Sequence, residues 1–197
     1  MVDAAPRLTL SDRLVTLAHS RYLWPVLLLV EIAETTILPL PYEAAFIALC
    51  LAARDRIWVF IVITVLGSAI GGSIIYALGA AYFDPIVARL GVESLAATYT
   101  ERFAERGASF IFLGGTTPAP SYLINLIAGA TGYPYGEFLG IFSASRFVRF
   151  AIPGGLLFLF GARLISAWAA LPNWLRRGLT ALLILALIYW FVSGFTD

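Results

Sequence analysis

A run of 24 residues without a charged side chain, 57–80, constrains the fold more than any other feature of this sequence. A helix of about 20 apolar residues is long enough to cross the hydrocarbon core of a bilayer. The composition agrees with this, because 60% of the 197 residues are hydrophobic, against roughly 45–50% in a soluble domain. We therefore predict a helical integral membrane protein.

Two further apolar segments, 22–52 and 108–133, are each interrupted by a Pro-x-Pro sequence. Prolines two residues apart cannot both lie in a regular helix interior, because each lacks a backbone donor. Backbone groups freed at membrane depth must be buried in protein or face water. We therefore predict that each segment is a re-entrant hairpin or a broken helix, interrupted at 38–42 and at 114–120. The motif residues are Pro39, Pro41, Thr117, Pro118 and Pro120.

The two broken segments hold matching positions in the two halves of the chain. The first is followed by the candidate span 57–80, and the second by a candidate span at 137–161. Interrupted segments at corresponding positions are typical of inverted-repeat transporters. The predicted fold class is an all-α membrane protein, an inverted repeat of two re-entrant helical hairpins that are each followed by a spanning helix.

We divide the chain into three parts. Residues 1–21 are predicted to contain an N-terminal amphipathic helix at the membrane interface, and residues 22–162 to form the membrane domain. Residues 163–197 are predicted to form an interfacial linker and a C-terminal spanning helix over 179–195, which carries no charge.

The most polar stretch, 81–108, is predicted to be a loop that connects the two halves. Apolar residues at every fourth position from Leu95 to Phe103 predict an amphipathic helix over 93–106, lying on the membrane surface. Gly107 is well placed to end this helix.

The distribution of arginine indicates the orientation of the chain, since all 13 basic residues are Arg. With re-entrant hairpins, eight arginines lie on the side of the N-terminus and three on the opposite side. With fully crossing segments the distribution is nine against two. Because basic residues favour the cytoplasmic side, both arrangements predict a cytoplasmic N-terminus.

The first broken segment contains Glu31, Glu34 and Glu43, and four charged residues of the predicted membrane segments are candidates for the site. Glu34 and Glu43 flank the first break, and Arg146 and Arg149 share one helix face of the second span. A charge near the bilayer centre costs at least roughly 2.5–3.5 kcal/mol, which favours burial against a partner. One interpretation is that carboxylate–guanidinium pairs hold the two halves together. The other is that a carboxylate exchanges protons while the arginines bind a phosphate headgroup.

Three uncharged residues complete the candidate set. Asn125 lies near the start of the helix after the second break, where backbone N–H groups can face an anion. Its amide could donate a hydrogen bond to such a ligand or pack against the backbone. Gly67 and Gly71 lie one turn apart and favour close packing of the span 57–80 against another helix.

Several functions are disfavoured by composition. Single copies of cysteine, Cys50, and histidine, His19, cannot provide a metal cluster, and the spans contain no serine–histidine pair. No long charge run indicates nucleic acid. We expect no enzymatic activity, no metal and no cofactor. The expected partners are membrane lipids, together with protons if transport is coupled to them.

In their order and spacing, the motifs resemble those of a known family. Glu34-x4-Pro39-x-Pro41-x-Glu43 is similar to the first re-entrant motif of the DedA superfamily, also called the VTT or SNARE-associated Golgi protein family. Ser145-Arg146-x-x-Arg149-Phe150 resembles the YqaA-like branch, and the similarity covers residues 24–162. Further matching positions are Gly67-x3-Gly71, Tyr76, Gly79, Glu101 to Gly107, Phe112, Thr117-Pro118-Ala119-Pro120 and Ala128-Gly129.

The resemblance implies two re-entrant loops that face each other in the membrane, and a function in lipid transport. Members of this family are thought to flip or scramble phospholipids or the polyprenyl phosphate carrier, and bacterial members are linked to the proton gradient. The expected function is therefore that of a flippase or scramblase in the bacterial inner membrane. A proton-coupled transporter of small solutes and a structural membrane protein are the alternatives.

The chain departs from the family pattern at three places. Gly72 stands where many members have an acidic residue, and Ala80 and Ser121 or Tyr122 stand where many have a basic one. Arg146 and Arg149 are candidates to supply the missing positive charge.

Overall fold

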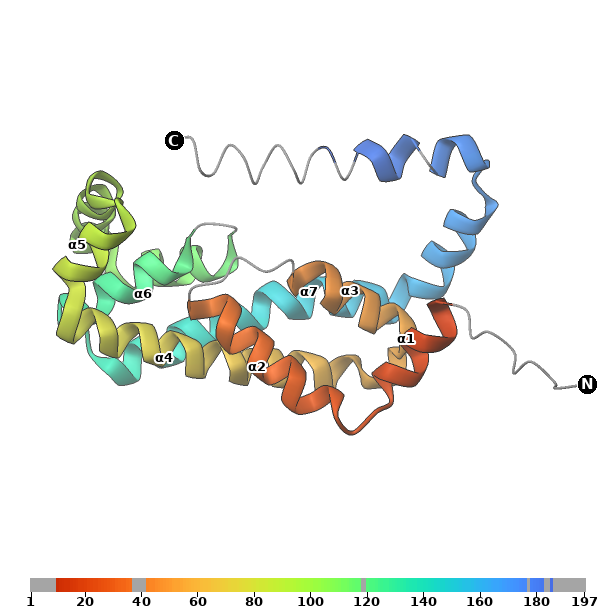
Figure 1. The fold of residues 1–197 in the computed structure, drawn as a ribbon, viewed down its shortest axis with the longest axis horizontal. Coiled ribbons are helices and arrows are strands. Elements are labelled where there is room, and N and C mark those ends of the chain that lie inside the picture. The colour runs from red at the N-terminus through yellow and green to blue at the C-terminus, as the bar shows by residue number, and fades with distance from the viewer. Residues whose placement is uncertain (1–9, 37–41, 118–119, 177, 183–184, 186–197) are drawn as a thin grey trace, which may run out of the picture. The chain divides into compact units, whose positions relative to one another are not determined.

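The computed structural model describes residues 10–36, 42–117, 120–176, 178–182 and 185 (Figure 1). Regular structure within these ranges is helical, with no strand, which confirms the predicted all-helical class. The chain forms two compact units, Met1–Phe158 and Leu159–Asp197. The first unit contains both broken segments and positions the candidate site.

The helices follow one another through the first unit, and the last continues into the second. They are α1 (Leu10–Ala18), α2 (Leu23–Thr36), α3 (Tyr42–Ala52), the 3-10 helix η1 (Arg54–Arg56), α4 (Ile57–Leu90), α5 (Glu93–Thr116), α6 (Ser121–Ala130) and α7 (Tyr135–Ala170). In the second unit, residues 173–176 and 178–182 are also helical. The predicted C-terminal span, 179–195, falls mostly outside the described residues.

Helix α4 contains the predicted span 57–80 and continues to Leu90. The backbone leaves helical geometry at Tyr82 (φ −141°, ψ 33°) and becomes helical again directly afterwards. Pro85 fits there because proline is tolerated in the first turn of a helix, where its missing N–H has no intrahelical partner. The predicted loop over 81–108 was therefore wrong, since Pro85 marks the restart of a helix and not its end.

Only Gly91 and Val92 separate α4 from α5. Gly91 adopts the left-handed conformation, with φ of 66°, and caps the end of α4. The predicted helix over 93–106 is present as the first part of α5. Gly107 leaves helical geometry (φ 35°, ψ −103°), as expected for the end of this helix, and a second helical stretch follows directly and runs to Thr116. Glycine permits this conformation because it has no Cβ.

The first predicted break coincides with a gap between helices. Helix α2 ends at Thr36 and α3 begins at Tyr42, so Pro39 and Pro41 lie outside the described residues. Helix α3 is apolar and has 11 residues, fewer than the roughly 20 that a spanning helix needs.

The second break repeats this pattern. Helix α5 ends at Thr116, and α6 begins at Ser121, directly after Pro120. Pro118 lies outside the described residues, whereas Thr117 is extended (φ −96°, ψ 166°). Helix α6 is apolar and has only 10 residues, so each break is followed by a short apolar helix.

Two apolar clusters form the core of the first unit, one around each broken segment. The first cluster includes residues of α2 and α3, the second residues of α5 and α6, and both include α4 and α7. Along α4, buried Ser68 lies between Ile61 of the first cluster and Ile75 of the second. Arg146 takes the corresponding place on α7. Buried polar groups therefore lie between the two apolar clusters.

Glycines allow α4 to approach its neighbours closely. The most extensive contacts of α4 are with α6 and α2. Gly67 and Gly71 lie against α2, and a Cβ added at Gly67 would be 2.8 Å from an α2 side-chain atom. Gly79 and Gly129 let the backbones of α4 and α6 meet, since a Cβ at Gly129 would be 1.9 Å from the Tyr76 carbonyl oxygen.

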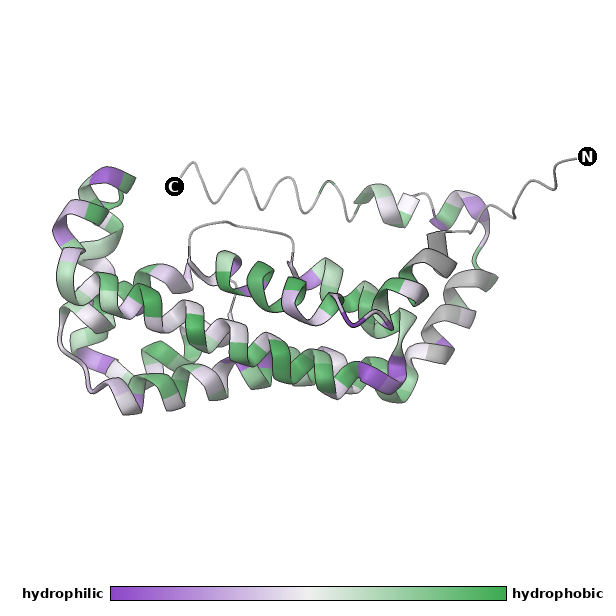
Figure 2. Cartoon of the chain, turned by 60° about the horizontal axis from the view of Figure 1, so that its bottom comes forward, coloured by the Kyte–Doolittle hydropathy of each residue, from purple (hydrophilic) through white to green (hydrophobic). Residues whose placement is uncertain are grey.

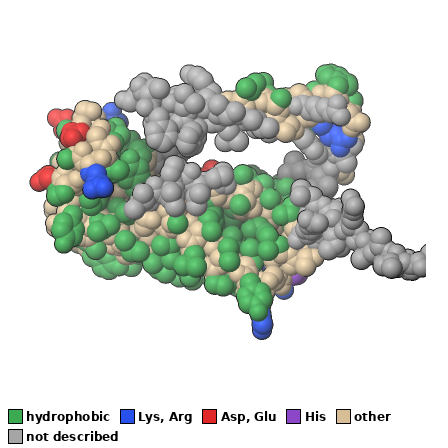
Figure 3. Space-filling view, viewed as in Figure 1, with side chains coloured by type: hydrophobic (Ala, Val, Ile, Leu, Met, Phe, Trp, Pro, Cys, Tyr) green, Lys and Arg blue, Asp and Glu red, His purple; other side chains and the backbone are tan. Residues whose placement is uncertain are grey.

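Apolar side chains also cover much of the outer surface of the first unit. Hydrophobic residues predominate along its long helices in Figure 2, and they dominate the face seen in Figure 3. On α4, Trp58, Val62, Leu66, Ile70 and Ile74 recur at every fourth position and are 43–54% exposed. Helices α4 and α7 are each long and apolar enough to cross a membrane. Soluble monomers rarely expose such a continuous apolar surface.

Candidate functional site

Arg149 of α7 connects the two broken segments. Its Nε donates a 2.7 Å hydrogen bond to Glu43 Oε1, and its Nη2 donates to the same oxygen. Its Nη1 donates a 2.9 Å hydrogen bond to the carbonyl oxygen of Thr117. Glu43 lies in the first turn after the first break, and Thr117 follows α5 at the second. One guanidinium thus binds both breaks through charge-assisted hydrogen bonds.

Arg146, one turn earlier on α7, is almost completely buried, with 1% of its surface exposed. Its Nη2 donates a 2.6 Å hydrogen bond to Ser121 Oγ at the start of α6. The guanidinium carbon lies 5.0 Å from the centroid of the Phe142 ring. Arg146 therefore brings a positive charge to Ser121, at the start of the helix that follows the second break.

Glu31 of α2 is a buried carboxylate that the sequence analysis did not place in the site. It is fully buried, and its Oε1 accepts hydrogen bonds from Ser68 of α4 and from Thr35. The signal in the sequence was its spacing, because Glu31 and Glu34 are three residues apart and share one face of an apolar helix. Charged residues inside apolar helices usually face the protein interior.

The charged residues of the site form one electrostatic group. Glu34 is half-buried and interacts with both arginines, and Arg146 interacts in addition with Glu31 and Glu43. Three carboxylates and two guanidiniums leave one net negative charge when all are ionised. A single proton would cancel that charge, and neutrality favours a buried group.

Asn125 of α6 is fully buried, beside Phe142 and Gly72. Neither its Oδ1 nor its Nδ2 has a hydrogen-bond partner among the described residues. The same holds for Glu31 Oε2 and for Arg146 Nε. Buried polar atoms are normally satisfied, so these unpaired atoms on three different helices set the region apart from the surrounding apolar clusters.

Packing accounts for one departure from the family pattern. A Cβ at Gly72 would lie 2.5 Å from the Phe142 ring and 3.4 Å from Asn125 Nδ2. An acidic side chain at this position would displace the ring over which Arg146 lies. The buried carboxylate in this region instead comes from α2, in the form of Glu31.

The predicted site residues fall into four groups. Glu34, Glu43, Arg146 and Arg149 are brought together, and Asn125 lies beside the Phe142 ring that Arg146 contacts. Thr117 takes part through its carbonyl, whereas Pro120 directly precedes α6. Gly67 and Gly71 contact α2. Pro39, Pro41 and Pro118 lie outside the described residues.

These features define a class of helical protein in which two short apolar helices follow two backbone breaks, with a buried charged group between the two halves. The model of the VTT domain matches residues 40–152. The chain therefore belongs to the VTT domain family, the DedA superfamily, whose proteins are membrane proteins. The match does not distinguish the YqaA-like branch from the others. Searches of the curated proteins and of the solved structures each gave no match.

Proposed function

We propose that this protein moves lipids with phosphate headgroups, phospholipids or polyprenyl phosphate, from one leaflet of a bilayer to the other. The proposal involves no covalent chemistry. It is supported by membership of a family of membrane proteins, by two helices long enough to span, and by the exposed apolar stripe of α4. The distribution of arginine in the sequence supports a cytoplasmic N-terminus in a bacterial inner membrane.

The contact of Arg149 with both breaks is the observation on which the proposal depends. Its Nε and Nη2 bind the Glu43 carboxylate, and a phosphate group offers the same acceptor geometry. A headgroup can therefore replace Glu43 as the partner of Arg149. Because Arg149 also holds Thr117, this exchange would loosen one broken segment while the other stays bound.

The charge balance of the group supports coupling to protons. Uptake of one proton by the three carboxylates would cancel the net negative charge of the group and leave more of the positive charge of the arginines available to a phosphate. Glu31, Glu34 and Glu43 are the carboxylates of this electrostatic group. Proton uptake and phosphate binding would then favour each other.

The test is transbilayer movement of headgroup-labelled phospholipid and polyprenyl phosphate in proteoliposomes, with and without a pH gradient. The native chain should exceed the rate of empty vesicles. Arg149→Ala should reduce this excess about tenfold or more, since a hydrogen bond to a charged group contributes roughly 1.5–3 kcal/mol. Glu43→Gln should abolish the effect of the pH gradient. Glu93→Gln, an exposed position on α5, is the matched control.

Well-folded native protein that moves neither lipid above the rate of empty vesicles would refute the proposal. Proton-coupled transport of a small solute through the same group would then be the next hypothesis to measure.

A structural role is the second candidate, and the Glu43–Arg149 ion pair favours it directly because the pair joins α3 to α7. The double variant Glu43→Arg with Arg149→Glu exchanges the two residues and distinguishes a structural ion pair from a phosphate-binding arginine. A structural ion pair should regain on exchange the folded yield that either single variant loses, apart from the contribution of the Thr117 hydrogen bond, which a glutamate at position 149 cannot donate. A phosphate-binding arginine cannot be replaced by glutamate, so lipid movement should be lost although the protein folds.

A further inference from the structure

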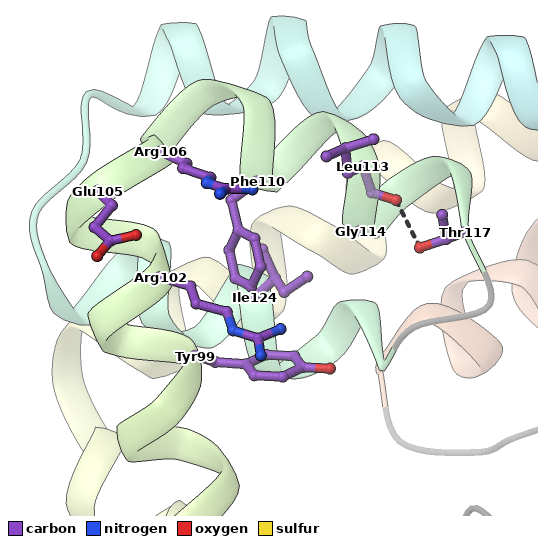
Figure 4. A pocket seen from close by; sticks show the side chains of 9 residues that line it. All are labelled: Tyr99, Arg102, Glu105, Arg106, Phe110, Leu113, Gly114, Thr117 and Ile124. Atoms are coloured by element: carbon purple, nitrogen blue, oxygen red, sulfur yellow. Dashed lines mark hydrogen bonds between the residues drawn. The ribbon is translucent and has the colours of Figure 1, made fainter.

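A groove with a volume of about 430 Å³ lies between α5 and α6, partly open to the outside (Figure 4). Its charged lining comes from Arg102, Glu105 and Arg106, and its apolar lining includes Phe110, Leu113 and Ile124. We propose that this groove binds the headgroup of an anionic phospholipid before the lipid is moved. The inference rests on the proposed function and on the expected position of residues 93–106 at the membrane surface.

The charges of the groove match an anionic headgroup. Arg102 and Arg106 are one turn apart on α5, share a face, and are exposed. Within the described ranges, neither guanidinium forms an ion pair or a hydrogen bond, so both are free to bind phosphate. In Figure 4 both side chains extend toward the apolar lining, whereas Glu105 lies at the edge. Two arginines and one glutamate give the lining of the groove a net charge of +1. This charge favours a headgroup with one negative charge over a zwitterionic headgroup.

The apolar lining is held in place by packing. The Phe110 ring makes edge contacts with Tyr99, at 5.4 Å between centroids, and with Phe103, at 6.5 Å. Gly114 lets α6 approach α5, because a Cβ there would lie 2.0 Å from Ile124 Cδ1. Ligand sites commonly have volumes of about 300–1,000 Å³, so the groove has room for a headgroup and the adjoining carbons. The remaining acyl chains would stay in the bilayer.

The groove adjoins the buried charged group through Thr117. This residue lines the groove, and its carbonyl oxygen accepts the 2.9 Å hydrogen bond from Arg149 Nη1. A headgroup bound by Arg102 and Arg106 would therefore lie beside the segment that Arg149 holds. The geometry makes the groove a first binding site, from which a lipid phosphate could pass to Arg149.

The test is lipid binding to the delipidated full-length protein in detergent, measured by native mass spectrometry with added phosphatidylglycerol, phosphatidylethanolamine or phosphatidylcholine. We expect tighter binding of phosphatidylglycerol than of the two zwitterionic lipids. Arg102→Gln with Arg106→Gln should weaken phosphatidylglycerol binding about tenfold. Arg89→Gln removes an exposed arginine of α4 that does not line the groove, and should leave binding unchanged.

Three outcomes would overturn the inference. The first is unchanged phosphatidylglycerol binding in the double arginine variant. The second is a preference for phosphatidylethanolamine that Glu105→Gln removes, which would make the site one for zwitterions. The third is displacement of the bound lipid by inorganic phosphate alone, which would make it a site for free anions. If the protein binds phosphatidylglycerol through these arginines but moves no lipid in proteoliposomes, the proposed function is refuted and the binding site is not.

Discussion

The substitution Gly129→Ala tests the close backbone contact between α4 and α6. The added Cβ would lie 1.9 Å from the Tyr76 carbonyl oxygen and 2.9 Å from the Ala80 nitrogen. A carbon and a carbonyl oxygen in contact are normally about 3.3 Å apart or more, so α4 and α6 must separate locally by more than about 1 Å. The Tyr76 oxygen and the Ala80 nitrogen both belong to the backbone, so neither can rotate away from the added Cβ.

We expect Gly129→Ala to lower the free energy of unfolding by about 3 kcal/mol, the upper end of the usual range for overpacking. For a chain of this length that corresponds to a fall in melting temperature of roughly 6–12 °C. The measurement is thermal unfolding of the purified protein in detergent. Gly140→Ala is the matched control, because Gly140 lies in α7 with nothing within 4 Å of an added Cβ. This variant should be unchanged or more stable by about 0.5–1 kcal/mol.

A second substitution sharpens the test. A Cβ at Gly79 would lie 2.0 Å from the Leu126 carbonyl oxygen, in the same crossing of α4 and α6. Because one separation of the helices relieves both collisions, the double variant should lose less stability than the sum of the single losses. Equal melting temperatures for Gly129→Ala and the native protein would show that the two helices do not meet in this way.

Three further predictions concern single residues of the first unit. Tyr42→Phe removes a buried 2.6 Å hydrogen bond to Thr64 Oγ1 and should cost about 1–2 kcal/mol in chemical unfolding; a smaller loss would mean that water replaces the hydroxyl. The Cys50 thiol is fully buried, so maleimide should label the native protein slowly and the denatured protein rapidly; equal rates would contradict that burial. Gly91→Ala places a side chain at φ 66° and should cost about 1–2 kcal/mol by thermal unfolding, although its surroundings are open; an unchanged stability would rule out the left-handed cap.

The sequence predicted the positions of the helices where prolines interrupt an apolar segment or where charged residues are absent from a long one. The absence of charge over 57–80 located α4, and the two Pro-x-Pro sequences located the ends of α2 and α5. The region 81–108 was predicted to be a loop because it is the most polar stretch of the chain, although 81–90 is helical. Whether proline ends a helix or starts one depends on the kink at Tyr82, a tertiary feature that no local pattern reports.

The members of the candidate site were more predictable than their pairing. Glu43 and Arg149 were conspicuous as charges in apolar segments, but the sequence left open which carboxylate meets which arginine. The structure pairs Glu43 with Arg149 and places Arg146 on Ser121, 25 residues away in the chain. Glu31 was recognised as a charge in the first broken segment but not as part of the site, because its partner Ser68 is 37 residues distant and resembles any small residue of a packed helix.

The contacts of α4 with both α2 and α6 have a mechanical consequence. Gly67 and Gly71 allow α4 to pack closely against α2, and Gly79 allows the backbone of α4 to contact the backbone of α6. Helices packed this closely move as one rigid body, because sliding would drive carbonyl groups into Cα atoms. The proposed transport would then move α3, whose contact with α7 includes the ion pair between Glu43 and Arg149. Distances between spin labels on α4 and α6 should stay constant during transport, while those between α3 and α6 change.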